Sequence, residues 1–191
     1  MGHNRGMDEP EKLGPLQGLI GEWEGDEGLD VSYHHAEGAP GETRYREKVT
    51  MNPFGPVDNG TQCLYGLDYR MAAWRGEEVD PFHTEIGYWL WDAGAGHVIR
   101  AFMVPRSTMV LAGADATADQ SRFTMSAELG STPWGVLETP YLATNACTVR
   151  YEVTVDVGDG EWSYESDTVL RMPQFEDLYH HTDRNTLRRV G

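Results

Sequence analysis

The chain has 191 residues, enough for one domain with a sizeable core, and a hydrophobic content of 39%, which is ordinary for a globular protein. Its 31 acidic and 15 basic side chains give a formal net charge of −16, which excludes a surface that binds nucleic acid or an anionic membrane by charge. No apolar run approaches the roughly 20 residues of a membrane span, and the polar start "MGHNRGMDEPEKLGP" lacks the apolar core of a secretion signal, so we expect a cytoplasmic protein.

The predicted organisation is a flexible arm over residues 1–12 and one domain over residues 13–191. The stretch "DEPEKLGPLQGLIG" has room for one short helical turn, and a first strand follows it. The rest of the chain consists of alternating segments separated by turn residues, with a turn-rich loop predicted for "NPFGPVDNG" (52–60). The predicted strands cover residues 42–51, 61–74, 82–91, 97–105, 107–114, 121–130, 143–160, 161–173 and 181–190.

The clearest strand is "YEVTVDV" (151–157), in which the aromatic and aliphatic side chains occupy one face and the polar side chains the other. About ten segments of this kind at regular spacing predict an all-β fold. We expect a closed or nearly closed antiparallel up-and-down β-barrel of about ten strands, preceded by a short helical segment.

The stretch "GLIGEWEGDEG" (18–28) predicts how one end of such a barrel is closed. Gly21 allows a tight turn into the first strand, and the large indole of Trp23 is suited to cover the barrel end. A basic residue at the end of the last strand, Arg188 or Arg189, would stack on that indole through a cation–π contact. A barrel that needs such a plug has a cavity.

Four stretches together resemble the nitrobindin-like haem-binding β-barrel family, which is fatty-acid-binding-protein-like and has the calycin architecture. They are "LIGEWEGDEG", "FHTEIGYWLW", "VPRSTMVLAG" and "YHHTDRNTLRRV", and the resemblance runs from about Leu13 to Val190. It implies a ferric haem b held by one histidine of the last strand. It also implies binding of nitric oxide, or isomerisation of peroxynitrite to nitrate.

The resemblance places the iron ligand in "HHTDRNTLRRV" (180–190). Neighbouring residues of a strand face opposite sides, so only one of His180 and His181 can point into the cavity. We expect His181 to be the proximal ligand, because it begins the run His-Thr-Asp-Arg-Asn-Thr-Leu, with His180 as the alternative.

Two further residues are candidates for the cofactor site. His83 shares a strand face with Glu85, Gly87 and Trp89, and it would lie on the distal side of a bound haem or simply hydrogen-bond to Glu85. Arg106 would hold a haem propionate or a fatty-acid carboxylate, or else form an ion pair at the rim.

Two other functions stay open. One is a cofactor-free binding protein for a small hydrophobic ligand such as a fatty acid, and the other is an enzyme in which His83 and Glu85 form an acid–base pair. The expected partner is a small molecule in the cavity, and the apolar segment "STPWGVLETPYL" (131–142) is a candidate homodimer face. Cys63 and Cys147 have no metal-ligand spacing and are expected to be reduced thiols, although a disulfide between them is not excluded.

Overall fold

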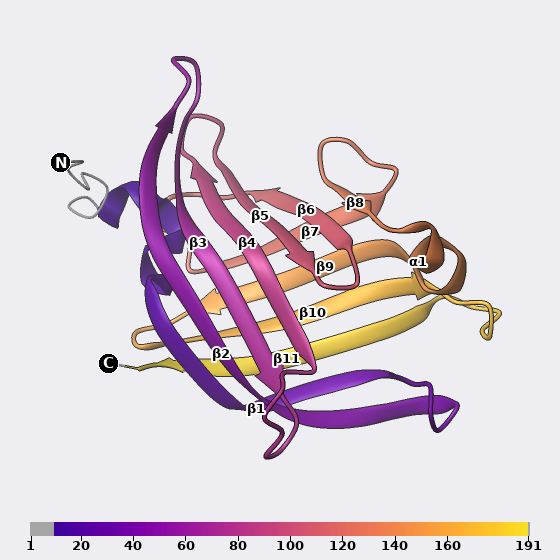
Figure 1. Ribbon diagram of the computed structural model, residues 1–191. Coiled ribbons are helices and arrows are strands. Elements are labelled where there is room, and N and C mark those ends of the chain that lie inside the picture. The colour runs from indigo at the N-terminus through magenta and orange to yellow at the C-terminus, as the bar shows by residue number, and fades with distance from the viewer. Residues whose placement is uncertain (1–9, 191) are drawn as a thin grey trace.

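Strands dominate the computed structural model, which describes residues 10–190 and contains eleven strands and two short helices over that range (Figure 1). Of the predicted arm over residues 1–12, residues 1–9 lie outside the described residues, and residues 10–12 belong to the first helix. In chain order the elements are η1 (Pro10–Leu19), β1 (Gly21–His34), β2 (Ala39–Asp58), β3 (Cys63–Trp74), β4 (His83–Asp92), β5 (His97–Val104), β6 (Thr108–Asp115), β7 (Arg122–Leu129), β8 (Gly135–Leu137), α1 (Pro140–Asn145), β9 (Cys147–Val157), β10 (Glu161–Arg171) and β11 (Tyr179–Arg189).

The strands form a closed barrel in the order β1-β11-β10-β9-β7-β8-β6-β5-β4-β3-β2, which confirms the predicted all-β barrel. Most neighbouring pairs are antiparallel and consecutive in the chain, as expected for an up-and-down meander. Within residues 10–190, three pairs are not consecutive: β1 pairs with β11 to close the barrel, β9 pairs with β7, and β8 pairs with β6. Because β8 runs parallel to β7, the sheet is mixed rather than purely antiparallel.

Two local predictions were wrong. Residues 52–58 belong to β2 and not to a loop, because the strand passes its Pro- and Gly-rich part through a register shift between Phe54 and Val57. Residues 143–146 precede β9, and most of them lie in the single turn of α1.

One end of the barrel is closed by η1, which lies against β3 and β4 (Figure 1). Its Leu13, Leu16 and Leu19 are buried together with Trp23 of β1 in the main hydrophobic cluster. The interior at this end is therefore packed with side chains, and any opening lies toward the other end of the strands.

A bulge in β1 determines which side chains of that strand face inward. The pairing of β1 with β2 shifts register between Gly25 and Gly28, where β1 advances three residues and β2 only two, so one extra residue interrupts the alternation. Trp23 points inward before the bulge, and after it the inward positions are Asp30 and Ser32 instead of Leu29. The bulge therefore brings the Asp30 carboxyl to the cavity wall.

The candidate dimer face 131–142 lies only partly on the outside of the barrel, because its Val136 and Leu142 are buried. Its Leu137 is exposed and pairs with exposed Met109, which pairs in turn with exposed Met103 and then Ile86, so an apolar row crosses four strands. Whether a second copy covers this row stays a prediction. No helix within residues 10–190 is long and apolar enough to cross a membrane, and Cys63 and Cys147 are both free thiols.

Candidate functional site

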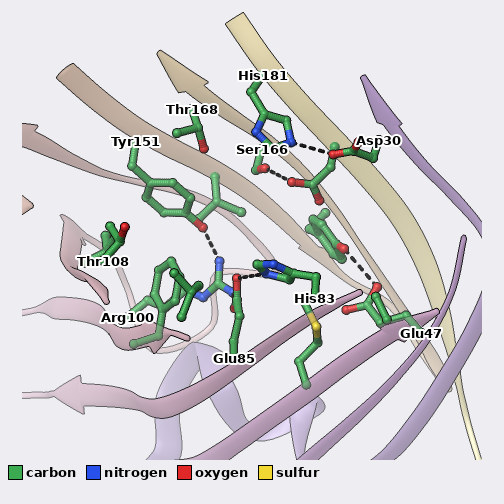
Figure 2. A pocket seen from close by; sticks show the side chains of 18 of the residues that line it. Asp30, Glu47, His83, Glu85, Arg100, Thr108, Tyr151, Ser166, Thr168 and His181 are labelled. Atoms are coloured by element: carbon green, nitrogen blue, oxygen red, sulfur yellow. Dashed lines mark hydrogen bonds and ion pairs between the residues drawn. The ribbon is translucent and has the colours of Figure 1, made fainter. Parts of the chain in front are cut away.

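The interior holds a cavity of about 350 Å³ between the closed end and the far ends of the strands. The inward residues of β4 lie progressively deeper along the strand: His83 is at the mouth of the cavity, Glu85 is below it, and Trp89 is at the floor. On β10 they pass in the same way from Thr168 at the mouth to Trp162, which packs edge-on against the plug residue Trp23. The walls combine aromatic and aliphatic side chains with an unusual number of ionisable ones (Figure 2).

His181 and Asp30 form one ion pair on the cavity wall, in the upper part of Figure 2. The Nε2 atom of His181 lies 2.5 Å from Oδ2 of Asp30, and the His181 side chain is 35% exposed. Burial lowers the pKa of His181, but the hydrogen bond and the charge of Asp30 outweigh it and raise the pKa above its usual value. Burial raises the pKa of Asp30, yet the contacts with His181 lower it overall, so the charged pair is favoured.

A second network lies across the cavity, where Glu85 of β4 joins His83 to Arg100 of β5 (Figure 2). Glu85 accepts hydrogen bonds from Arg100 Nη2 at 2.5 Å and from the Tyr69 hydroxyl at 2.8 Å, and its Oε1 lies 3.2 Å from His83 Nε2. Burial raises the pKa of Glu85, but the Arg100 charge and His83 lower it to about 2. Arg100 also donates to the Tyr151 hydroxyl.

The same contacts act on His83. Burial lowers the pKa of His83, but the hydrogen bond and the charge of Glu85 raise it above the usual value. Both cavity histidines are therefore paired with a carboxylate, and both are disposed to carry a proton.

A third network occupies the wall formed by β2, β10 and β11. Glu47 is fully buried, and its Oε2 accepts hydrogen bonds from the Tyr164 hydroxyl and from Asn185 Nδ2, both at 2.9 Å. Burial raises the pKa of Glu47 to about 7. Burial also raises the pKa of Asp183, which accepts a hydrogen bond of 2.5 Å from Ser166.

The predicted ligand candidates fall into distinct places. His181 and His83 line the cavity, whereas His180 lies on the outer surface with Nδ1 2.8 Å from Asp167. Arg106 is exposed at the turn between β5 and β6 and lines the mouth. At Gly87, on the same strand as His83, a Cβ would lie 2.0 Å from the Ala101 carbonyl oxygen of the adjacent strand, so backbone closes this position.

The predicted plug residues gather at the closed end. Trp23 is buried and donates from Nε1 to the Leu19 carbonyl at 2.8 Å, and the guanidinium carbon of Arg189 lies 4.3 Å from the Trp23 ring centroid. Gly21 has a φ of 128°, and a Cβ there would lie 2.6 Å from the Arg189 guanidinium, so the absence of a side chain makes room for the stack. Arg188 instead faces outward toward acidic side chains.

Sequence reasoning missed several cavity residues, namely Asp30, Glu47, Arg100, Tyr69, Tyr151 and Asp183. For Arg100 a signal was present, because in "HVIRAF" it shares a strand face with two apolar residues, Val98 and Phe102. Within the described residues, no cluster of three or more His, Cys, Asp and Glu side chains is arranged to hold a bare metal ion.

Comparison with known proteins agrees with this architecture. A family model described as "THAP4-like, heme-binding beta-barrel domain" matches residues 12–189. Among solved structures, the crystal structure of Rv2717c from M. tuberculosis aligns with a TM-score of 0.65 and 17% identity, covering 93% of this chain and 98% of that one. At this identity the likeness shows the fold alone. No curated protein matches the sequence.

Proposed function

Because the chain belongs to the family of THAP4-like, heme-binding β-barrel domains, we propose that its cavity binds haem b and that His181 supplies the axial imidazole. The observation that carries the proposal is the orientation of the last strand, which turns His181 into the cavity and His180 away from it. The family match confirms the resemblance inferred from the sequence. The ligand and the activity are our proposal.

His181 can bind iron as the neutral imidazole, with Nε2–H donating to Asp30 and Nδ1 deprotonated, so haem binding would release the proton that the ion pair otherwise favours. Asp30 holds Nε2, while Nδ1 has no hydrogen-bond partner among residues 10–190 and is open to the cavity (Figure 2). Histidines that bind metals commonly donate their other ring nitrogen to a carboxylate, which fixes the ring orientation. Either ring nitrogen of a histidine can bind a metal.

The mouth of the cavity has basic side chains suited to the propionates of a porphyrin and apolar side chains suited to its ring. Arg75 and Arg106 are exposed at the opening, where guanidinium groups would hold the propionates. Beneath them, Phe82, Phe102 and Val104 provide apolar surface for the ring. The deeper part fits less well, because it contains the buried ion pair of Glu85 and Arg100 rather than apolar side chains.

If bound there, ferric haem would supply an iron that can bind nitric oxide or peroxynitrite. The contribution of the chain is His83, which lies across the cavity from His181 (Figure 2). Glu85 keeps the His83 ring oriented and raises its pKa, so the imidazole holds a proton with which it can hydrogen-bond an oxygen of the incoming ligand without giving that proton up. We therefore propose isomerisation of peroxynitrite to nitrate as the activity.

Titration of the purified protein with ferric haem tests this proposal. We expect a Soret band that shifts and saturates at one equivalent, and loss of that spectrum in His181→Ala. The matched control is His180→Ala, which removes the adjacent outward imidazole and should leave the spectrum unchanged. His83→Ala should keep haem affinity but alter cyanide or nitric oxide binding, and it should lower the yield of nitrate from peroxynitrite.

The three variants separate the alternatives. If His180→Ala abolishes the spectrum and His181→Ala does not, the ligand assignment is wrong. If haem binds equally to all three variants, the cavity takes it as a generic apolar ligand, and a cofactor-free binding function replaces the proposal. A wild-type protein without any saturable shift would rule out haem binding altogether.

A further inference from the structure

The floor of the cavity contains three hydrogen-bond donors without a partner. They are Nε1 of Trp89, Nε1 of Trp162 and Nε of Arg100, and each atom is buried and unpaired among the described residues. The residues themselves are 1%, 3% and 7% exposed, and all three line the cavity. Buried polar groups in folded proteins are almost always hydrogen-bonded, so three unpaired donors at one place require an explanation.

The three donors belong to one cluster. The ring centroids of Trp89 and Trp162 are 6.4 Å apart, and the Arg100 guanidinium carbon lies 5.0 Å from the Trp89 centroid. An indole N–H and a guanidinium N–H can only donate. The neighbouring acceptor is already in use, because the Glu85 carboxylate accepts hydrogen bonds from Arg100 and Tyr69. A ligand that satisfies this floor must therefore bring its own acceptors.

The charge around the floor also points to the ligand. Arg100 is the one buried basic side chain in the described range, and His83, whose pKa is raised by Glu85, lies next to the same network. Glu85 is the ionised carboxylate that faces both of them. Glu47 and Asp183 also act on His83, so the case for an acceptor ligand rests on the unpaired donors and on the guanidinium charge of Arg100 rather than on a count of charges. Hydrogen bonds from charged donors to an anion are the strong ones.

We propose that the floor of the cavity binds a small monoanionic oxyanion head group, held by the N–H groups of Trp89, Trp162 and Arg100. Nitrate and the carboxylate of a small organic acid share this chemistry: oxygen atoms that only accept, and one negative charge. The aromatic rings and Phe102 would pack against whatever apolar part the anion carries. The site lies below His181 and Arg106 but shares Phe102 with the surface assigned to the porphyrin ring, so its occupancy is measured on the haem-free protein.

Indole proton resonances of the full-length protein provide a direct test. The chain has six tryptophans, so a ¹H–¹⁵N spectrum shows up to six indole N–H signals. Titration with sodium nitrate and, separately, with sodium hexanoate should move two of them in a saturable way. Trp89→Phe and Trp162→Phe should each delete one moving signal and weaken binding roughly tenfold or more, as loss of a hydrogen bond to a charged group implies.

Trp91→Phe is the matched control, because Trp91 is buried on the same strand but does not line the cavity. It should delete a signal that does not move and leave the affinity unchanged. A response to nitrate and hexanoate alike shows that the head group suffices, and a response to hexanoate alone assigns the site to organic acids. If no indole signal moves, if only other tryptophans respond, or if sodium chloride has the same effect, the proposal is wrong. The haem titration is a separate measurement, so the two proposals fail independently.

Discussion

Replacing Glu47 by Gln should remove a pH dependence of stability that this carboxyl creates. Burial raises the pKa of Glu47 from the ordinary 4.5 to about 7. Between these values the folded protein keeps a proton that the unfolded chain has released, so the stability of the wild type falls as the pH rises and levels off above pH 7. At about 1.36 kcal/mol per pH unit, the difference amounts to about 3 kcal/mol.

Glutamine keeps the shape and the acceptor of the side chain. Its amide oxygen can take the place of the Oε2 atom that accepts from Tyr164 and Asn185, so the protonated wild type and Glu47→Gln should be similar at low pH. Urea unfolding followed by tryptophan fluorescence, from about pH 5 to about pH 8, measures the difference. We expect Glu47→Gln to gain about 3 kcal/mol relative to the wild type across this range.

The control is Glu22→Gln, which changes an exposed carboxyl at the start of β1. It should track the wild type at every pH. A stability difference between Glu47→Gln and the wild type that stays constant with pH would refute the reasoning, because it would mean that Glu47 is ionised in the folded protein throughout.

Three other substitutions probe the fold. Trp23→Ala should cost about 3–5 kcal/mol in urea unfolding, because the indole is buried and closes the barrel end; a loss below about 1 kcal/mol would contradict the plug. Glu85→Ala should cost about 3–5 kcal/mol by leaving Arg100 buried without its carboxylate, and a small loss would show that water reaches the pair. Gly87→Ala should prevent soluble expression, since its Cβ would lie 2.0 Å from the Ala101 oxygen; a well-folded variant would show that β4 and β5 can separate.

The barrel itself was predictable because inward and outward residues alternate along most strands, as in residues 151–157. The secondary-structure elements that were not predicted have no such alternation. β8 has three residues and pairs partly in parallel, and α1 is a single turn, so neither extends over a period that a pattern can reveal. The Pro- and Gly-rich part of β2 has the composition of a loop, and only its pairing with β3 keeps it extended.

Site residues could be predicted on strands in which inward and outward residues alternate regularly, and they were missed where a bulge interrupts that alternation. Alternation allowed only one of His180 and His181 to face the cavity, and the family resemblance selected His181, which does line it. For His83, alternation predicted a strand face shared with Glu85 but not whether that face is inward. Asp30 could not be found in this way, because the register shift between Gly25 and Gly28 moves the inward positions of β1 from odd to even residues. The partners of these side chains, such as Arg100 for Glu85, come from strands whose pairing no local pattern specifies.

The bulge in β1 also bears on how such a cavity changes during evolution. Loss of one residue between Gly25 and Gly28 would restore the original alternation, turning Leu29 and Val31 inward and Asp30 and Ser32 outward. The plug around Trp23 lies before the bulge and would keep its place. A single-codon deletion would thus exchange a polar wall for an aliphatic one without any substitution. The polarity of this part of the cavity wall is therefore set partly by the length of one short segment, and a deletion there would change it from polar to apolar.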